Sequence, residues 1–392
     1  MKSKGFLRSF TLENFKAIQK SGAVHFTPLT VLIGNNGSGK SSLVEGLETY
    51  RSIIVDGLDT AMQKWFGMDH VWNKRMRHNM IRLGLANETY ENPIRFALAG
   101  RTGVGTYRAG MAVNARPGLN GFLIQEESCA STDGVKFTRD RHGVVKFADK
   151  TATEGRRFEP GESALPQKMR DFVSRWQFLS LHPDPMGRPA PRKMTSNGEM
   201  VLHRDGSNLA QYLLGIRNRD QAAFEGIVEA MQFVLDYVRN FEPVETREIQ
   251  PTMYIKMLEQ ITDRPIEVPG WLISTGTIRI LALLAVLRNP VPPPLIVVEE
   301  IENGLDPRTI HLVLDEIRSA VQAGQSQVIL TTHSPYLLDL LPIQTLVLVE
   351  RKRGGDPVFW RPAGNKEVLE WAKKFAPGQL YTTGRFRREV KS

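Results

Sequence analysis

Short runs of apolar residues recur along the chain and have the length and composition of buried β-strands. One such run, Leu29–Ile33, precedes a glycine-rich turn, and another, 295–300, ends in two adjacent glutamates. Residues 327–330 form a further run, and 346–349 with 357–360 have the pattern of two closing strands. Strands of this kind, bounded by turn residues and separated by helical segments, indicate an α/β fold.

Amphipathic and wholly apolar stretches between these runs predict helices. Residues 310–321 place apolar side chains on one helical face, and Asp306 precedes them as a suitable N-cap. Residues 280–287 are apolar on nearly every side, which predicts a buried helix with Ser274 as its N-cap. Apolar residues at helical spacing also predict a helical segment over 209–238.

The turn after Leu29–Ile33 matches the phosphate-binding loop G-x-x-x-x-G-K-[ST] at every fixed position. Strand, loop and helix follow in the order that the motif requires. Backbone N–H groups of the loop would bind phosphates, Lys40 would contact the β- and γ-phosphates, and the Ser41 hydroxyl would bind Mg²⁺. The sequence thus predicts a nucleoside triphosphate site, formed by Asn35, Asn36, Gly37, Ser38, Gly39, Lys40, Ser41 and Ser42.

The run 295–300 brings two carboxylates, Glu299 and Glu300, to the end of a strand. Alternation along a strand would turn the two side chains to opposite sides. We therefore assign Glu299 to the magnesium shell and Glu300 to positioning or deprotonating the attacking water. His333 follows the run 327–330, at the carboxyl end of a strand, where α/β sheets carry their chemistry. A surface acid pair without function is the alternative interpretation of the two glutamates.

A second candidate anion site lies where the apolar helix over 280–287 begins. With Ser274 as N-cap and Gly276 close behind it, the helix start can present N–H groups and the positive end of its dipole to a γ-phosphate. Taken alone, the same residues also describe an ordinary capped helix of the core.

The composition limits the classes of protein that remain. With 392 residues, 41% of them hydrophobic, the chain is long enough for more than one structural unit with a full core. Its single cysteine, Cys129, excludes an intramolecular disulfide framework and is consistent with a reducing cytoplasm. The sequence has no run of about 18 apolar residues, so we expect a cytoplasmic protein that does not enter a membrane. The net charge of +9 favours an anionic partner such as DNA or RNA.

Residues 61–265 separate the phosphate loop from the Ser274 segment and differ from both in pattern. Alternating apolar residues with polar turns predict β-hairpins between residues 100 and 150. The segment lacks a sustained heptad repeat, which argues against a coiled coil. Basic clusters could contact a phosphate backbone while neighbouring aromatic rings stack on bases, although such clusters are more often only solvated. The clusters lie at 74–77, 188–193, 351–353 and 385–388, and the aromatic residues are Trp65, Trp72 and Phe386.

Together these motifs resemble the ABC-type ATPases of the SMC and RecF group. The resemblance rests on their order: the phosphate loop, S-x-G-x-x-R at Ser274, the Glu299-Glu300 pair, Gly-Leu-Asp-Pro and Thr-His-Ser-Pro. The nearest branch is the ATPase head of the OLD (overcoming lysogenization defect) proteins and their stand-alone AAA-family relatives, to which residues 12–16 and 205–209 are also similar.

This resemblance implies a P-loop NTPase of the α/β class, with an ABC-type two-lobed head and an inserted α+β region. It implies ATP and Mg²⁺ as ligands and a homodimer that encloses two nucleotides. It does not decide whether the dimers assemble into higher oligomers. Ser274, Gly276 and Arg279 would then act on the nucleotide of a second chain, Asp306 would lie at the dimer interface, and His333 would contact the γ-phosphate.

The chain departs from the family pattern in ways that narrow the expectation. The Ser274 segment is not the Leu-Ser-Gly-Gly-Gln signature of transporter ATPases, which disfavours a transporter. Glu299 stands where many relatives have Asp, so a water could lie between the carboxylate and Mg²⁺. Gln167 and Gln177 are candidates by position for a further metal ligand. Fewer residues follow His333 than an independent domain needs, so we expect no nuclease module in this chain.

We therefore expect an N-terminal ATPase lobe over 1–60, an insertion over 61–265 and a C-terminal ATPase lobe over 266–392. The expected function is ATP hydrolysis coupled, through dimerisation, to nucleic acid or to a partner effector protein such as a nuclease or toxin. The family resemblance implies a role in antiphage defence or DNA maintenance. The alternative is a nucleotide-gated scaffold that holds a toxin or nuclease subunit with little ATP turnover.

Overall fold

The computed structural model describes residues 5–76, 79–82, 88–102, 105–116, 121–140, 143–148, 156–191, 201–246, 251–260, 264–351 and 353–386. The chain forms two compact units. The first unit comprises residues 1–176 and 341–392, and the second comprises residues 177–340. Parts of the sequence that lie far apart therefore meet within the first unit.

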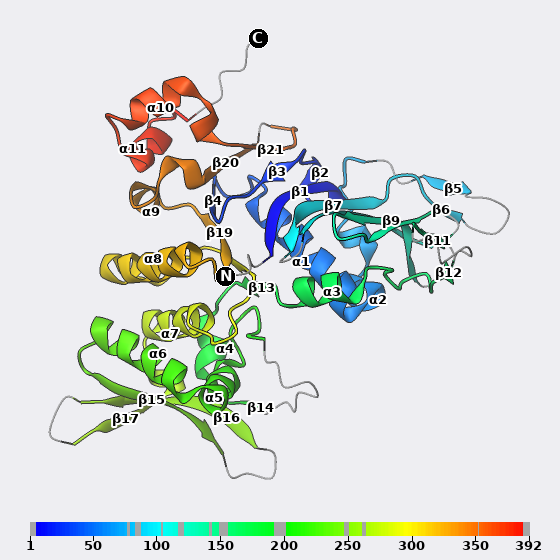
Figure 1. Ribbon diagram of the computed structural model, residues 1–392. Helices are drawn as coiled ribbons and strands as arrows, with labels where there is room; N and C mark the ends of the chain where they lie inside the picture. The colour runs from blue at the N-terminus through cyan, green and yellow to red at the C-terminus, as the bar shows by residue number, and fades with distance from the viewer. Residues whose placement is uncertain are drawn as a thin grey trace. The chain divides into compact units, whose positions relative to one another are not determined.

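An antiparallel sheet makes up much of the first unit, with the strand order β12-β11-β10-β9-β8-β7-β1-β2 and β3 paired to β1 (Figure 1). The hairpins expected between residues 100 and 150 are confirmed, because β8 to β11 pair in sequence order. The strands are β1 (Phe6–Phe15), β2 (Ile18–Lys20), β3 (Val24–His25), β7 (Ile94–Thr102), β8 (Gly105–Ala115), β9 (Phe122–Ser131), β10 (Lys136–Arg139), β11 (Val144–Phe147) and β12 (Arg156–Arg157).

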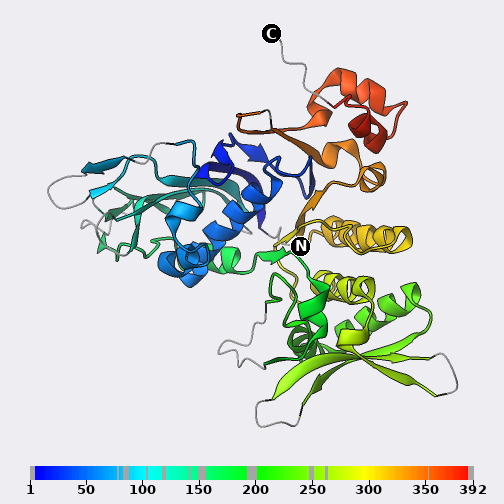
Figure 2. The same cartoon turned by 180° about the vertical axis from the view of Figure 1, so that it is seen from behind.

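Helices of the first unit cover one face of this sheet. Helix α1 (Lys40–Asp56) packs against β1, and α2 (Leu58–Gln63) packs against β9, as the two opposite views show (Figures 1 and 2). Helix α3 (Gln167–Ser174) contacts α1 in turn. A short pair, β5 (Met80–Arg82) and β6 (Glu88–Tyr90), belongs to the same unit.

The strand that carries the phosphate loop, β4 (Leu29–Ile33), is buried along its whole length. It pairs in parallel with β20 (Leu346–Arg351), which pairs antiparallel with β21 (Pro357–Trp360). The closing strands expected at 346–349 and 357–360 are thus confirmed. Helices α10 (Lys366–Ala372) and α11 (Pro377–Thr382) follow them.

The second unit contains three parallel strands in the order β13-β18-β19. These strands are β13 (Gln177–Leu179), β18 (Leu295–Val298) and β19 (Gln327–Thr332), and their residues are buried, as expected for parallel strands. The helices expected after Ser274 and Asp306 are present as α7 (Thr275–Leu287) and α8 (Pro307–Gln322). Every residue of α7 from Thr277 onward is buried.

A second, antiparallel sheet in this unit packs against helices α5 and α6. The sequence predicted one helical segment over 209–238, and this prediction is wrong because the segment is broken at Asp220. Asp220 has extended backbone, and its side chain caps a new helix by accepting from Ala223 N. The sequence also turns into strand at Val238. The elements are α5 (Leu209–Arg219), α6 (Gln221–Val234), β15 (Val238–Glu245), β16 (Thr252–Glu259), β17 (Ile266–Pro269), β14 (Ala190–Pro191), and the short helices α4 (Pro183–Gly187) and α9 (Pro335–Asp339).

The division into an N-terminal lobe, an insertion and a C-terminal lobe follows the ATPase motifs and stays a prediction. The compact units cut across it, since the hairpins of the expected insertion belong to the first unit and its helices α5 and α6 to the second. Among the described helices, none is both long and apolar enough to cross a bilayer.

Candidate functional site

The phosphate loop joins β4 to α1 and presents an open helix N-terminus. Gly39 is the N-cap of α1 with φ 110°, and no side chain caps the helix there. The N–H groups of the first turn are therefore placed to meet an anion. A side chain at Gly39 would also put its Cβ 2.5 Å from Cγ of Pro357, so both the backbone angle and the space require glycine.

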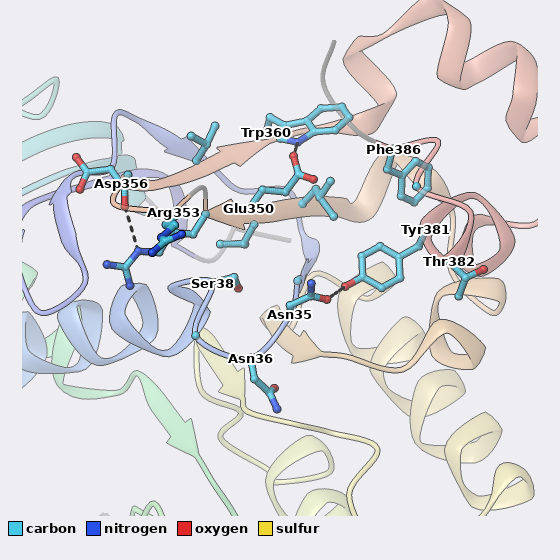
Figure 3. Close-up of a pocket in the computed structure, with 18 of the residues that line it drawn as sticks. Asn35, Asn36, Ser38, Glu350, Arg353, Asp356, Trp360, Tyr381, Thr382 and Phe386 are labelled. Carbon is cyan, nitrogen blue, oxygen red and sulfur yellow. Dashed lines mark hydrogen bonds between the residues drawn. The ribbon is translucent and has the colours of Figure 1, made fainter. Parts of the chain in front are cut away.

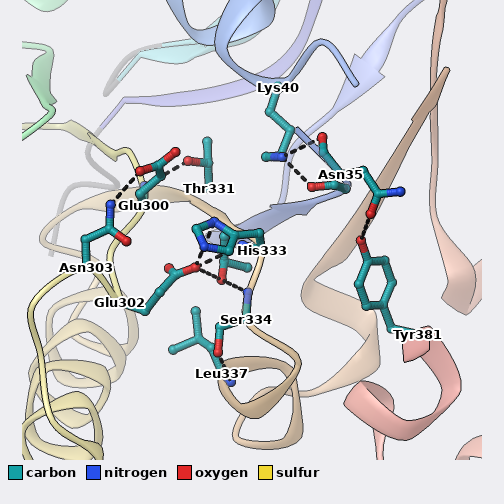
Figure 4. A network of polar contacts seen from close by, with 12 residues as sticks. Asn35, Lys40, Glu300, Glu302, Asn303, Thr331, His333, Ser334, Leu337 and Tyr381 are labelled. Carbon is teal, nitrogen blue, oxygen red and sulfur yellow. Dashed lines mark hydrogen bonds and ion pairs between the residues drawn. The ribbon is translucent and has the colours of Figure 1, made fainter. Parts of the chain in front are cut away.

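Lys40 is buried, and its amine lies over the carbonyl groups of its own loop. The amine donates to the carbonyl of Gly34 and, at 3.2 Å, to the carbonyl of Asn35 (Figure 4). Ser38 Oγ is also buried and has no hydrogen-bond partner within the described part of the chain. Gly37 and Ser41 are exposed. The loop thus combines a buried cation, a buried hydroxyl and uncapped N–H groups, which is the donor set that phosphate oxygens need.

A cavity of about 1720 Å³ adjoins the outer side of the phosphate loop (Figure 3). Residues 34–38 line it together with β20, β21, the turn between them and residues 381–386. Tyr381 donates its hydroxyl to Asn35 Oδ1 at 3.0 Å, and burial raises the pKa of that hydroxyl. The sequence did not predict this contact, because nothing in the pattern links α11 to a loop more than 300 residues earlier.

Glu299 and Glu300 follow β18, in a turn rather than in the strand. The pairing with β19 ends at Val298, and Glu300 has a positive φ of 47°. Glu299 N still donates to the carbonyl of Leu179 on β13 at 2.8 Å, so strand pairing ends between the two acids, and Glu299 is buried whereas Glu300 is exposed. Glu300 N donates to Thr331 Oγ1 at 2.9 Å, and Asn303 donates its side-chain amide to the Glu300 carboxylate (Figure 4).

The carboxylate of Glu299 is largely buried and forms an ion pair with Arg204. The residue assigned to the magnesium shell therefore already has a cation beside it. Mg²⁺ would have to replace Arg204 or share the carboxylate with it. Arg204 directly precedes the segment 205–209 that the sequence singled out, but only the fold brings it to Glu299.

His333 follows β19, as expected, and a glutamate that the sequence did not single out holds it. Glu302 Oε1 accepts from Thr332 Oγ1 at 2.7 Å and from the backbone N–H of His333 at 2.9 Å. The same oxygen lies 3.5 Å from His333 Nδ1 (Figure 4). The only sequence signal for Glu302 was its position two residues after Glu300.

Arg279 is buried on α7 and binds within its own unit. Its guanidinium donates to the carbonyl of Leu181 at 2.9 Å and to the carbonyl of Glu300 at 2.8 Å. Burial lowers the pKa of Arg279, and the nearby Glu302 and Glu300 oppose that effect. A role for Arg279 at the nucleotide of a second chain does not fit this placement, because the side chain is already engaged beneath the Glu300 turn.

Ser274 and Gly276 begin α7 as expected. Ser274 Oγ accepts from Thr277 N at 3.2 Å, which confirms the N-cap. A Cβ at Gly276 would lie 2.6 Å from the carbonyl oxygen of Gly304, so glycine lets the helix start approach the turn before α8. Asp306 caps α8 by accepting from Arg308 N and Thr309 N. The action of Ser274 and Gly276 on a second chain's nucleotide stays a prediction.

Other candidates from the sequence are buried or are bonded to protein groups. The Gln177 side chain is buried and donates to the carbonyl of Leu202 at 2.7 Å, and Gln167 donates to Asp171. Trp72 and Phe386 are buried, so the expectation that they stack on bases is wrong. Of the basic clusters, residues 77, 192–193, 352 and 387–388 lie outside the described residues. Arg75 donates to backbone carbonyls and pairs with Asp356, which is a structural role.

The described residues contain no group of three His, Cys, Asp or Glu side chains that could hold a metal by themselves. A magnesium ion fits this chemistry, because it takes few protein ligands and completes its shell with phosphate oxygens and water. The Ser41 hydroxyl and the Glu299 carboxylate are hard oxygen donors of the kind that Mg²⁺ prefers.

Comparison with known proteins shows which family shares these features. The family model described as "AAA domain, putative AbiEii toxin, Type IV TA system" matches residues 29–339, most of the chain. A second model, described as an AAA ATPase domain, matches residues 6–50. No curated protein matches the chain.

Solved structures that are similar to this chain include heads of SMC proteins. The SMC head domain from Thermotoga maritima is 13% identical, with a TM-score of 0.44, and the match covers 91% of this chain and 98% of that one. An Smc head domain with an extended coiled coil, bound to the C-terminal domain of ScpA derived from Pyrococcus furiosus, is 12% identical with a TM-score of 0.47. That match covers 94% of this chain and 100% of the other.

Proposed function

Because the chain belongs to the AAA-domain family whose model spans residues 29–339, we propose that it is an ABC-type ATPase that binds and hydrolyses ATP with Mg²⁺. We propose further that ATP brings two copies together and that this dimerisation acts on nucleic acid or on a partner effector protein. Antiphage defence or DNA maintenance is the proposed setting. The net charge of +9 supports an anionic partner.

The observation that carries the proposal is the uncapped N-terminus of α1 beneath the phosphate loop. Its N–H groups and dipole favour phosphate oxygens, and the buried Lys40 adds a positive charge. When ATP binds, the Lys40 amine exchanges the carbonyls of Gly34 and Asn35 for phosphate oxygens. Ser41 and Glu299 are the residues proposed to hold Mg²⁺, which would supply positive charge to offset the phosphates.

Glu300 is the proposed base or water-positioning residue. Its turn is fixed from three sides, by Thr331 at the backbone N–H, by Arg279 at the carbonyl and by Asn303 at the carboxylate. A carboxylate held in one orientation can accept a proton from, or orient, a water molecule that attacks the γ-phosphate. His333 would contact the γ-phosphate from the end of β19.

A second chain completes the proposed site. Ser274 is exposed at the start of α7, and the N-terminus of this helix can face the γ-phosphate of the other copy's nucleotide. Asp306, which is also exposed, begins the next helix along the chain. These residues support a composite site, in which neither chain alone surrounds the nucleotide.

Substitutions at Lys40 and Glu300 test the ATPase. We expect Lys40→Ala to weaken ATP binding by at least about tenfold, because it removes the charge that faces the phosphates. We expect Glu300→Gln to retain ATP binding and to lower steady-state turnover by about 100-fold or more, because the amide cannot take a proton. ATP affinity is measured by calorimetry, and turnover by phosphate release.

Glu229→Gln is a suitable control, because it makes the same change at an exposed residue of α6, a helix that carries none of the proposed site residues. It should leave both quantities unchanged. If Glu300→Gln hydrolyses ATP at the unmodified rate, the assignment of Glu300 is wrong. If the unmodified chain binds ATP without measurable turnover, hydrolysis itself is refuted.

The Arg204–Glu299 ion pair favours a second candidate function, a nucleotide-gated scaffold with little turnover. An arginine on the metal-binding carboxylate would slow hydrolysis while leaving nucleotide binding intact. Steady-state turnover with and without DNA at low salt separates the two functions. A nucleic-acid-coupled ATPase should accelerate when DNA is added, whereas a scaffold should stay slow in both conditions.

A further inference from the structure

We propose that Glu302 is the positioning residue of His333, so that the turn after the acid pair fixes the imidazole at the reacting phosphate. This inference rests on the proposed ATPase function and adds a residue that the motifs do not identify. Glu302 acts through His333 and touches no substrate itself. Its role is to hold the segment after β19 in one conformation.

The contacts of Glu302 converge on the residues that end β19. One carboxylate oxygen accepts from the Thr332 hydroxyl at 2.7 Å and from the His333 amide at 2.9 Å, and it lies 3.5 Å from His333 Nδ1. A single oxygen therefore fixes the backbone and faces one nitrogen of the ring. A carboxylate on this side of the ring favours the ring orientation in which Nδ1 points toward it.

Burial makes this arrangement more than a surface contact. The Glu302 side chain is only 10% exposed, whereas the imidazole of His333 is 47% exposed. The carboxylate is thus largely buried, and the ring that it contacts is half exposed. Charge-assisted hydrogen bonds at a buried carboxylate are stronger and more directional than those at a solvated one.

The same carboxylate connects His333 to the Glu300 turn. Among the charged neighbours of the buried Arg279, Glu302 has the largest effect in raising its pKa. Arg279 in turn donates to the Glu300 carbonyl. The second Glu302 oxygen and Arg279 Nε are both buried without hydrogen-bond partners among the described residues. The negative charge of Glu302 therefore acts on the cation that holds the Glu300 turn, while its other oxygen bonds the end of β19 that carries His333.

The alternative is that Glu302 only stabilises the turn before α8, as many buried carboxylates do. Under that role, removal of the carboxylate would lower the stability of the fold and, with it, the fraction of active protein. It would have no specific effect on the chemical step. A positioning role instead predicts a loss in kcat with little change in ATP affinity, because His333 would serve mainly after the nucleotide has bound. These outcomes can be measured separately.

The test compares Glu302→Ala and Glu302→Gln with the unmodified chain. For Glu302→Ala we expect kcat to fall by about 10- to 100-fold and KM for ATP to change by less than about threefold. Glu302→Gln keeps an oxygen that can accept from Thr332 and His333, so it should recover kcat to within about threefold of the unmodified chain. Added to His333→Ala, the change Glu302→Ala should cost little more, because the residue acts through His333.

Glu316→Ala is the matched control. Glu316 is a half-buried carboxylate of the same unit that makes two charge-assisted bonds to Arg288, so its loss should lower stability without lowering kcat. The proposal is overturned if Glu302→Ala lowers kcat no more than Glu316→Ala does. It is also overturned if the effects of Glu302→Ala and His333→Ala multiply fully.

A readout that needs no turnover keeps the inference separate from the proposed function. In the unmodified chain the His333 amide is bonded to Glu302, so hydrogen exchange of a peptide spanning 331–336 should speed up in Glu302→Ala and not in Glu316→Ala. Unchanged exchange refutes the anchoring whatever the ATPase assay gives. Faster exchange in a chain that hydrolyses no ATP refutes the ATPase and leaves the anchoring intact.

Discussion

At the scale of single residues, the acid pair shows how one turn gives neighbouring carboxylates different surroundings. Glu299 is largely buried beside Arg204, whereas Glu300 has a left-handed backbone and bonds to Asn303. The first carboxylate is compensated by a cation, and the second is held by neutral donors. The exposed Glu300 carboxylate is thus free to meet a water molecule, whereas Mg²⁺ at Glu299 would have to replace Arg204 or share the carboxylate with it.

Arg204→Ala tests whether Arg204 competes with Mg²⁺ for the Glu299 carboxylate. Removing the guanidinium leaves a largely buried carboxylate without its cation, so we expect the chain to unfold at lower temperature in the absence of metal. Mg²⁺ bound with ATP should then raise the unfolding temperature by more than it does in the unmodified chain. The Mg²⁺ concentration that gives half-maximal ATPase activity should fall by about threefold or more.

The measurement is a magnesium titration of ATPase activity at saturating ATP, with thermal unfolding recorded in the same buffers. Arg188→Ala serves as the control, since Arg188 pairs with Asp184 at the surface and should change neither quantity. If Arg204→Ala requires more Mg²⁺ than the unmodified chain, Arg204 orients Glu299 for the metal and does not compete with it.

Residue types in the motifs were predictable, but their partners were not. The pattern identified Lys40, Glu299, Glu300 and His333, because fixed spacing ties each to a loop or a strand end. Glu302 and Arg204 were missed, because their roles depend on contacts between segments far apart in sequence. Arg279 was recognised, but the S-x-G-x-x-R spacing does not reveal its partners, the carbonyls of Leu181 and Glu300.

At the scale of elements, helix ends carry the candidate chemistry. Helix α1 begins without a side-chain cap and stays open to an anion, whereas α8 begins at Asp306, whose carboxylate accepts from Arg308 N and Thr309 N. The Thr309 hydroxyl also donates to Asp306. Asp306 thus already has a structural role in its own helix, whatever it contributes at a dimer interface.

Asp306→Ala should cost about 1 kcal/mol of the free energy of unfolding, because the first turn of α8 loses its cap. Urea unfolding measures this cost. Asp315→Ala on the same helix is the control, since its exposed pair with Arg318 contributes little. Equal stability of the two variants would contradict the capping role.

The pH dependence provides a second check on the cap. The hydrogen bond from Thr309 is the main cause that lowers the pKa of Asp306 below its ordinary value of 3.8. A carboxyl group with a lower pKa in the folded state stabilises the fold above its unfolded pKa and loses that effect as pH falls through the folded value. The difference between Asp306→Ala and the unmodified chain should therefore narrow below about pH 4.

Elements were predictable where one signal dominated. Strand β4, the hairpins β9 to β11 and the buried helix α7 follow from apolar runs and turn residues. The break between α5 and α6 did not follow from periodicity, because apolar spacing continues past Asp220 and only its capping bond separates the helices. The strand β18 likewise ends at Val298, one residue before the acids, where its ladder to β19 stops.

At the scale of the whole molecule, the motifs are distributed over two compact units. The phosphate loop with Lys40 belongs to the first unit, and Glu299, Glu300 and His333 belong to the second. The sequence gives the identity of these motifs and their order, whereas the partition into units depends on contacts that join residues 341–392 to the N-terminal part. The proposed function requires both units and a second copy of the chain.

The mass of the Glu300→Gln chain with and without ATP tests the central claim most directly. This variant should bind ATP and stall before hydrolysis, so light scattering with ATP and Mg²⁺ should give twice the 44.2 kDa of one chain. Without ATP, or when Lys40→Ala is added, the mass should return to 44.2 kDa. A Glu300→Gln chain that is saturated with ATP and still has the mass of a single chain would contradict an ATP-dependent composite site.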